Sequence, residues 1–444
     1  MNKDTTTPQK KENIAQDIEG FLQELIGGND LSVDKHRKPS GRKAILPALV
    51  LWSGVIIAVL RGFSSQLQIW RLVSWEGFWN YSQYPVTDQA VYNRLADERG
   101  QAAMQALFYR VRDGLKERLA PYAQQKLATF ATGVYAIDGS TLDKVARHLP
   151  KLREVANGDS KLLPGKIVGV FDVRYQQWRE MLHLANPNQN DKFVATRLLK
   201  AIPVGSLVLA DLGFFSFPWF DTLTDNGYWW ISRLRNKVTY EVIHTFYQNG
   251  DTFDGLIWLG KYRADRAAHA VRLVTFSIGK VHFRYITNVR NPLQLTMKDI
   301  AMLYARRWDI EMAFKMVKRH LKLHILWSAK PQIIILQLWA VLTIAQILHA
   351  LQMEIAGLAQ VDPFDVSLNL VTQYVPRLIQ EGKNPVQMIV EDGRRFGFIR
   401  PSRRIRIQTP EYDESQITPL PDDIVLMRKP RYAQRKCGPR GLSP

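Results

Sequence analysis

Cysteine is nearly absent from this 444-residue sequence, with Cys437 as its single example. A lone thiol excludes an internal disulfide and a cysteine-based zinc cluster. Chains without disulfides are typical of reducing compartments, and the first twenty residues lack the apolar core of a signal peptide. We therefore expect a cytoplasmic protein.

Acidic residues are also in short supply. The chain has 41 Asp and Glu against 60 Lys and Arg, a formal net charge of +19. This excess favours a polyanionic partner, either nucleic acid or an anionic membrane surface. Neither glycine-rich phosphate-binding motif, G-x-x-x-x-G-K-[ST] or G-x-G-x-x-G, occurs, so ATP-driven and dinucleotide chemistry have no support.

Long hydrophobic runs are missing as well. The uncharged segment 44–60 is shorter than the ~20 residues of a typical spanning helix and contains Pro47 and Gly54. A second apolar segment, 333–351, is interrupted by Gln337, Gln346 and other polar residues. We interpret both segments as buried core helices and expect no membrane partner, which leaves nucleic acid as the expected polyanion.

The middle of the chain alternates strand-like and helical patterns. Short apolar runs occur at 133–138, 167–173, 178–184, 206–211 and 228–233. Such alternation predicts an α/β layer domain. Turn signals at Asn249-Gly250 and Gly279-Lys280 then predict an antiparallel β insertion.

These patterns divide the chain into six expected parts. They are a polar leader (1–43), a helical N-terminal DNA-binding region (44–127), the α/β domain (128–235), its β-rich insertion (236–290), the second part of the domain (291–352) and a basic C-terminal region and tail (353–444). Within the N-terminal region 44–127, the segment 86–95 fits the second helix of a small DNA-binding bundle, although an ordinary amphipathic helix is the favoured interpretation. The Pro- and Arg-rich tail from 401 onward is expected to pack poorly.

Two acids, Asp138 and Asp211, each stand at the carboxyl end of an apolar strand. Functional groups of α/β folds lie at such ends, although a single Asp there is commonly a turn or helix-cap residue. Neighbouring strands can bring two such carboxylates within reach of one ion. The pair alone leaves both interpretations open.

A third acid, Glu311, lies in the helical pattern of 304–323. A helix turns by about 100° per residue around its axis. On this basis one carboxylate, one tyrosine and three cations lie on a single stripe of the helix surface, roughly 60° wide. Its members are Tyr304, Arg307, Glu311, Lys318 and Lys322. A solvated face with an i,i+4 ion pair is one explanation. Metal-assisted phosphodiester chemistry is the other, because carboxylates bind divalent cations while Arg and Lys hold phosphate.

The same residues resemble a known signature. Tyr304, Arg307, Glu311 and Lys318 match Y-x2-R-x3-E-x6-K of the insertion-sequence-four family of bacterial DDE transposases, relatives of the Tn-five transposase. IDGSTL at 137–142 resembles the family's first Asp motif. DLGFF at 211–215 resembles the second, except that Leu212 stands where Arg is usual.

The resemblance covers roughly 130–325 and implies a fold. That fold is a ribonuclease-H-like α/β catalytic domain interrupted by an antiparallel β insertion, with helical N-terminal and C-terminal regions. It also implies that Asp138, Asp211 and Glu311 bind two Mg²⁺ ions, for which Mn²⁺ can substitute. The other stripe residues, including Lys322, would contact DNA. Trp258 is the candidate for a family tryptophan that stacks near a flipped base.

The implied activity is cut-and-paste DNA transposition. Metal-dependent hydrolysis at transposon ends is followed by strand transfer, in many relatives through DNA hairpins. The implied partners are double-stranded DNA, with the end inverted repeats and the target, and a second copy of the chain on DNA. The expected location is the bacterial cytoplasm, at the nucleoid.

Two alternatives remain open at this point. One is a catalytically inactive, transposase-derived DNA-binding protein. The other is a tyrosine recombinase, since His269 and Arg272 match H-x-x-R and Tyr304 follows them.

Overall fold

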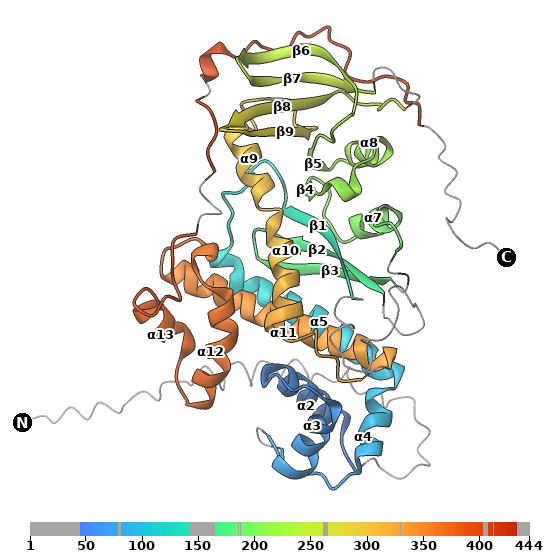
Figure 1. Ribbon diagram of the computed structural model, residues 1–444, viewed down its shortest axis with the longest axis vertical. Helices are drawn as coiled ribbons and strands as arrows, with labels where there is room; N and C mark the ends of the chain where they lie inside the picture. Colours follow the sequence, from blue (N-terminus) through green and yellow to red (C-terminus); the bar gives the residue numbers. More distant parts are fainter. Residues whose placement is uncertain are drawn as a thin grey trace, which may run out of the picture.

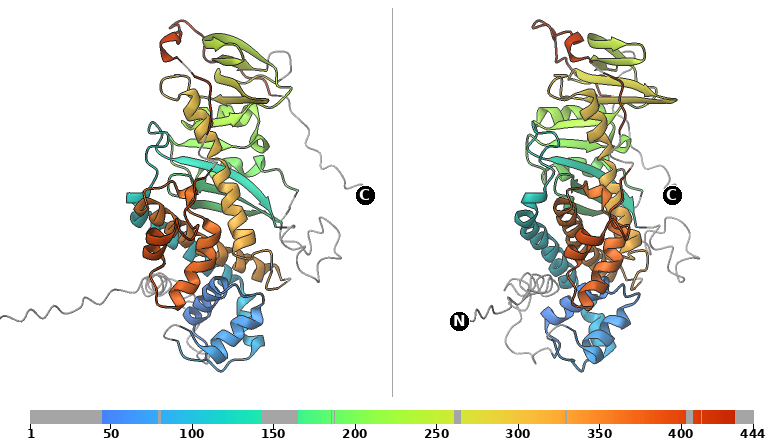
Figure 2. Two further views of the ribbon diagram at one scale, coloured as in Figure 1. Left: turned by 60° about the vertical axis from the view of Figure 1, so that its left-hand side comes forward. Right: turned by 90° about the vertical axis from the view of Figure 1, so that its left-hand side faces the viewer.

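The computed structural model describes residues 45–432, except for 79–80, 143–164, 185, 187, 261–264, 329, 403–406 and 412. The predicted polar leader lies outside these residues. Figures 1 and 2 show an elongated molecule with a small helical group at one end and the inserted strands at the other. The remaining strands and most helices lie between these two ends.

The N-terminal helices follow local signals in the sequence. They are α2 (Ala48–Leu60), α3 (Gln66–Arg71), the π-helical turn η3 (Leu72–Glu76), α4 (Asp88–Leu95), α5 (Glu98–Leu119) and the 3-10 turn η4 (Ala120–Tyr122). The Thr87 hydroxyl accepts from the backbone N–H of Ala90 and caps α4, while Asp97 caps α5. Most of α2 is buried, as expected for a core helix.

One nine-stranded sheet runs through the centre of the molecule. Its strands are β1 (Val134–Thr141), β2 (Lys166–Asp172), β3 (Gln177–Leu184), β4 (Leu207–Ala210), β5 (Trp229–Arg233), β6 (Tyr240–Asn249), β7 (Thr252–Leu259), β8 (Val271–Ile278) and β9 (Val281–Thr287). Their order is β3-β2-β1-β4-β5-β9-β8-β7-β6. The five predicted strands and the predicted β insertion are therefore confirmed.

The first five strands form the ribonuclease-H-like part of the sheet. Strands β1, β4 and β5 are parallel, and β2 is antiparallel to β1 and β3. The inserted strands β6 to β9 do not form a separate layer. Strand β9 pairs antiparallel with β5, so the insertion extends the same sheet.

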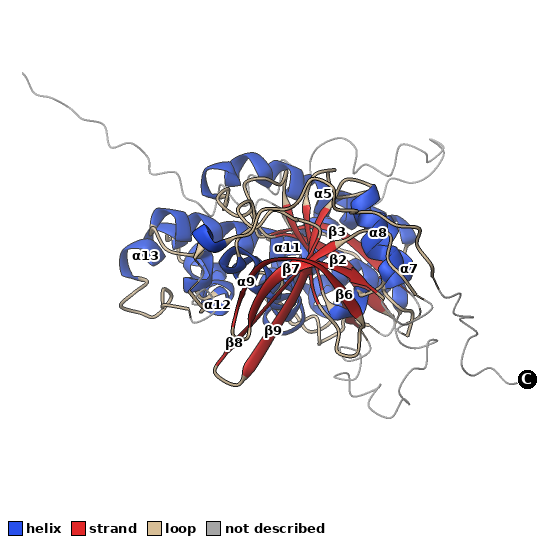
Figure 3. Ribbon diagram, turned by 90° about the horizontal axis from the view of Figure 1, so that it is seen from above, coloured by secondary structure: helices blue, strands red, loops and turns tan. Residues whose placement is uncertain are grey.

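Helices cover both faces of the first five strands (Figure 3). One face packs against α7 (Lys192–Leu199) and α8 (Phe217–Asp225), together with the short 3-10 turn η6 (Leu212–Phe214). The other face packs against α10 (Trp308–Lys315) and α11 (Pro331–Leu358). This sandwich fixes the positions of the strand ends.

Helix α11 is the central core helix of the fold. Within the described residues it is the one helix long and apolar enough to cross a membrane, and 94% of its most apolar window is buried inside the protein. Helix α5 packs along it, and both helices contact β3. Helix α5, which belongs to the expected N-terminal region 44–127, therefore shares the core of the α/β domain.

The predicted single helix over 304–323 is wrong in one respect. The chain forms α9 (Met297–Ala305), breaks at Arg306 and Arg307, forms α10, and then widens into the π-helical turn η7 (Met316–His320). A capping box starts α9, because Thr296 and Asp299 exchange side-chain-to-backbone bonds there.

The C-terminal part contains the 3-10 turn η8 (Pro363–Asp365), α12 (Leu368–Gln380), α13 (Pro385–Asp392) and the 3-10 turn η10 (Glu414–Gln416). The described residues of the tail from 401 to 432 are mostly exposed and none of them is buried, in keeping with the expectation of poor packing, but several are bonded to the rest of the chain. Arg428 donates to the carbonyls of Ala267 and Leu259, and the Tyr432 hydroxyl bonds Asp221. The tail therefore docks on the β insertion and on α8.

Candidate active site

Parallel pairing of β1 with β4 places two of the predicted acids side by side. Ile137 is paired with Ala210, and the next residue on each strand is Asp138 and Asp211 respectively. Asp138 is part of β1, whereas Asp211 directly follows β4 and is the N-cap residue of the turn η6. Both carboxyl groups therefore stand at one edge of the sheet, where α/β folds display functional groups.

Helix α10 brings the third acid to the same edge. It contacts β1 and β2 and carries Glu311. The Arg307 guanidinium, one turn earlier, lies among all three acids. Its Nη2 is 2.6 Å from Glu311 Oε1, its Nη1 is 3.9 Å from Asp138 Oδ2, and its Nε is 4.0 Å from Asp211 Oδ1. Three distant segments of the chain thus converge on one guanidinium.

The site has an uneven exposure to solvent. The side chain of Asp138 is 21% exposed, that of Asp211 is 43% exposed, and that of Arg307 is 7% exposed. Burial, together with the negative charges of Asp211 and Glu311, raises the pKa of Asp138 to about 6, although the Gly139 N–H and the Arg307 guanidinium act to lower it. Asp138 therefore binds a proton more readily than an exposed carboxyl group.

Hydrogen-bond donors at this edge lack partners. Among the described residues, the buried Tyr304 hydroxyl and the Nε and Nη1 atoms of Arg307 have no hydrogen-bond partner. Burial raises the pKa of Tyr304 to about 12, so its hydroxyl keeps its proton. Unsatisfied buried donors are costly, and the oxygens of a bound phosphate could satisfy them.

The two predicted lysines behave differently from each other. Lys318 lies in the π-helical turn and donates to the hydroxyl of Ser140 and the carbonyl of Thr141, at the end of β1. It therefore stands next to the acid-bearing strand. Lys322 has a φ of 56°, beyond the end of the helix, and its amine points to the carbonyl of Gly62. The predicted stripe fails at Lys322 because the π-turn changes the helical phase.

Trp258 does not reach the acids. It lies at the carboxyl end of β7. Strands β5, β9, β8 and β7 are joined by successive antiparallel pairs, so β7 runs opposite to β5. The carboxyl end of β7 therefore lies at the edge of the sheet opposite to the acids. The ring is 8% exposed, and the Arg428 guanidinium covers it at 4.5 Å. The structure therefore does not bring this predicted residue into the site.

Sequence reasoning missed the aromatic side chain that does lie there. Trp308 is 50% exposed, and its ring is 5.5 Å from the Arg307 guanidinium. With Tyr304, Tyr285 and Arg233 it lines a pocket of about 350 Å³ between α9, α10 and the insertion. Its position directly after Arg307 in the sequence was the available signal.

Three cations at and just beyond the end of β5 were also missed. Every second residue from the end of this strand onward is an exposed cation, namely Arg233, Arg235 and Lys237. Arg235 donates to the carbonyl of Leu212, the residue after Asp211. The segment that follows β5 therefore places the Arg235 guanidinium beside Asp211, the second acid. The alternating cations in the sequence were the signal for this basic edge.

The acids do not form a finished metal site in this arrangement. Within the described parts of the chain, no three His, Cys, Asp or Glu side chains stand close enough together to hold one ion. The cation that lies among the carboxylates is the Arg307 guanidinium. Carboxylate oxygens are hard ligands of the kind that Mg²⁺ prefers. The three acids therefore fit divalent cations once the Arg307 guanidinium moves away from them.

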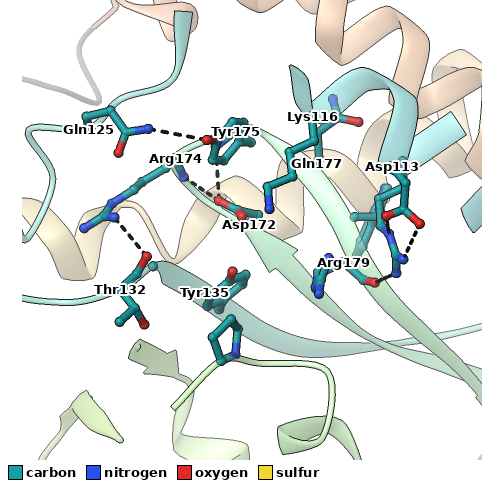
Figure 4. A pocket seen from close by; sticks show the side chains of 14 residues that line it. Asp113, Lys116, Gln125, Thr132, Tyr135, Asp172, Arg174, Tyr175, Gln177 and Arg179 are labelled. Carbon is teal, nitrogen blue, oxygen red and sulfur yellow. Dashed lines mark hydrogen bonds and ion pairs between the residues drawn. The ribbon is translucent and has the colours of Figure 1, made fainter. Parts of the chain in front are cut away.

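A second pocket lies at the other end of β1 (Figure 4). It has a volume of about 220 Å³ and is lined by Tyr135, Asp172 and Arg174, among others. Arg174 donates to several backbone carbonyls, and Asp172 accepts from the backbone N–H groups of Arg174 and Tyr175. These groups hold the β2–β3 turn, so we do not assign the chemistry to this pocket.

The tyrosine-recombinase interpretation conflicts with the position of its arginine. Arg272 has no exposed surface and forms a buried ion pair with Asp254, at 2.5 Å. His269 bonds Asp225, and neither side chain faces Tyr304. The required cluster of tyrosine, histidine and arginine is therefore absent from these described residues.

Comparison with known proteins finds a family match over the segment that carries the three acids. Residues 130–347 match the family described as "Transposase DDE domain". The chain is 24% identical over 206 residues to the Sinorhizobium fredii protein named "Putative transposase y4zB"; this match covers 45% of the chain and 56%, just over half, of that protein.

A solved structure of a piggyBac transposase synaptic complex with hairpin DNA is also similar. The similarity covers 89% of this chain and 85% of that one, at a TM-score of 0.38 and 9% identity, a level that carries no argument about function. The family match is confined to residues 130–347, a segment that is similar to the transposase DDE domain and contains Asp138, Asp211 and Glu311.

Proposed function

We propose that the protein is a cut-and-paste DNA transposase of the insertion-sequence-four type. It would cleave DNA at transposon ends and join the freed 3′-hydroxyl to a target. The observation that carries the proposal is the convergence of Asp138, Asp211 and Glu311 on one cation, beside phosphate-type donors that lack partners. Strand cleavage needs this combination of carboxylates and cations.

In this proposal, the three acids hold two Mg²⁺ ions, or Mn²⁺ in their place. When bound, such ions stabilise the attacking and leaving oxygens of an in-line displacement at phosphorus. Arg307 and Tyr304 hold the oxygens of the terminal phosphate. Lys318 fixes the end of β1 through Ser140 and so positions the first acid.

The DNA would also contact parts of the chain outside this edge. The exposed Trp308 ring is the aromatic surface on which a flipped base could stack, a role for which it replaces Trp258. The small helical group around α4 is proposed to bind the end repeats. Two copies of the chain would pair two ends, as the resemblance implies.

The alternative is an inactive DNA-binding derivative. The presence of all three acids together with their cation supports the active enzyme, since binding alone does not need carboxylates near phosphate. The two alternatives differ in one measurable activity, which is DNA cleavage.

The test is strand cleavage by the full-length protein. The substrate is a duplex that carries the inverted repeats flanking the gene, with Mg²⁺ or Mn²⁺. We expect nicks at the repeat boundary that EDTA abolishes and that a scrambled repeat does not support. Cleavage that persists in EDTA, or no cleavage of the true repeats with either metal, would contradict the proposal.

Arg235 offers a separate test of the DNA path. Replacing it with alanine should weaken binding of end DNA and reduce the slope of log affinity against log salt by about 0.9, the value for one lost phosphate contact. Filter binding or fluorescence anisotropy over a salt series measures the slope. The matched control is Lys298→Ala, an exposed cation at the far end of α9, which should leave the slope unchanged. Equal slopes for wild type and Arg235→Ala would remove Arg235 from the interface.

A further inference from the structure

The Arg307 guanidinium occupies an unusual position for a phosphate-binding group. It is within 4.0 Å of a carboxylate oxygen from each of the three acids, and it is almost fully buried among them. A phosphate cannot bind its inward-facing atoms while they face carboxylates. Divalent cations cannot bind the same acids while the guanidinium lies between them.

The contacts that hold the guanidinium are unequal. The bond from Nη2 to Glu311 is short, at 2.6 Å, and forms within one helical turn. The other two approaches, at 3.9 Å and 4.0 Å, are ion pairs without hydrogen bonds, since Nη1 and Nε lack partners in the described chain. Arg307 is therefore held toward Asp138 and Asp211 mainly by charge, which another cation can replace.

Electrostatics explains why a cation is needed there at all. Three carboxylates at one sheet edge repel one another, and this repulsion contributes to the raised pKa of Asp138. A positive group in their midst reduces the repulsion. The rings of Tyr304 and Trp308 lie within 5.8 Å of the same guanidinium and line the region beside it.

We propose that Arg307 is an internal counter-cation, which holds the three acids together in the metal-free protein and must leave them when divalent cations bind. This inference rests on the proposed function, because it takes the acids to be the metal ligands. Arg307 is then a positioning residue with two alternative sets of partners, the carboxylates and the DNA phosphate.

This arrangement makes metal binding and DNA binding favour each other. A phosphate that forms a bidentate pair with the guanidinium draws it away from the acids and frees them for metal. By thermodynamic reciprocity, metal that displaces the guanidinium makes it available to phosphate. The protein alone would therefore bind metal weakly, and the DNA end would complete the site.

The test measures metal binding without DNA and without activity. Calorimetric titration of the full-length protein with Mn²⁺ at pH 8, where Asp138 is ionised, compares wild type with Arg307→Gln. We expect the variant to bind Mn²⁺ about tenfold more tightly, within the usual range for coupled sites. The matched control is Lys315→Gln, which removes an exposed cation from the same helix, α10. Its affinity should stay close to that of wild type.

Two results would overturn the inference. One is equal affinity of wild type and Arg307→Gln. The other is an equal gain for Lys315→Gln, because that would show a general effect of removing positive charge. If Arg307→Gln does not fold, structures of the wild-type protein with and without Mn²⁺ decide: the inference requires the bond from Arg307 to Glu311 to break when Mn²⁺ is present, and an intact bond contradicts it.

Failure of this inference is distinguishable from failure of the proposed function. Metal-dependent cleavage of end DNA combined with unchanged Mn²⁺ affinities contradicts only the role of Arg307. Absence of Mn²⁺ binding in every variant, with no metal-dependent cleavage, contradicts the proposed function and the inference together.

Discussion

Replacing Asp138 with asparagine is expected to lower strand cleavage by about a thousandfold, equivalent to ~4 kcal/mol of transition-state stabilisation. The substitution keeps the size of the side chain but removes the charge that the parallel pairing of β1 and β4 places beside Asp211. Binding of end DNA should be retained, because removing a negative charge near phosphate does not weaken their contact. Cleavage of labelled end duplexes, together with an affinity measurement, tests both expectations.

The same substitution should stabilise the metal-free protein at neutral pH. The pKa of Asp138 rises from 3.8 to about 6 on folding, so the folded state binds more protons between these two values. Stability contributed by this group is therefore present at low pH and is lost as pH rises through about 6. At pH 7, Asp138→Asn should gain on the order of 2 kcal/mol in the free energy of unfolding, and the gain should vanish below about pH 4.

Denaturant unfolding in EDTA at pH 4 and pH 7 measures this difference. Asp113→Asn is the matched control, because Asp113 is 62% exposed on α5 and distant from the carboxylates. It should change neither cleavage nor the dependence of stability on pH. Cleavage by Asp138→Asn at the wild-type rate would exclude Asp138 from the catalytic group. An Asp138→Asn variant less stable than wild type at pH 7 would contradict the argument that burial and the neighbouring acids disfavour the ionised carboxyl group.

The sequence predicted the parts of the site that depend on local pattern. Apolar runs that end in Asp138 and Asp211 are strands, and their parallel pairing brings the two acids together. The turn signals at Asn249-Gly250 and Gly279-Lys280 predicted the hairpins of the insertion. These features follow from residues close together in the chain, for which side-chain periodicity is a sufficient guide.

Features that depend on packing were not predictable in this way. The π-helical turn shifts the helical phase after Lys315, so extrapolation at a fixed angle misplaces Lys322. The location of Trp258 depends on the order of four inserted strands, which no local pattern gives. The position of Arg307 among the acids results from three separate segments, so the spacing of the motif alone could not distinguish a phosphate ligand from a counter-cation.

The buried ion pair of the insertion gives the second large expected effect. Arg272 and Asp254 have no exposed side-chain surface, and Nε and Nη2 of Arg272 bond the two carboxylate oxygens at 2.6 Å and 2.5 Å. Nη1 of Arg272 also donates to the carbonyl of Leu295, at 2.6 Å, just before α9 begins. Arg272→Met should therefore cost about 3–5 kcal/mol, because it leaves a buried negative charge without the guanidinium.

A double variant can distinguish the cost of a buried, unpaired charge from the cost of lost packing. If the cost comes from the buried charge, the double variant Arg272→Met with Asp254→Leu should recover much of the stability, since apolar replacement of both partners is often neutral. Lys280→Met, an exposed cation in the β8–β9 turn, should change stability by no more than about 0.5 kcal/mol. Denaturant midpoints measure all three variants. A double variant as unstable as Arg272→Met would instead assign the effect to the bond with Leu295, through which the insertion fixes the start of the helix that carries Tyr304.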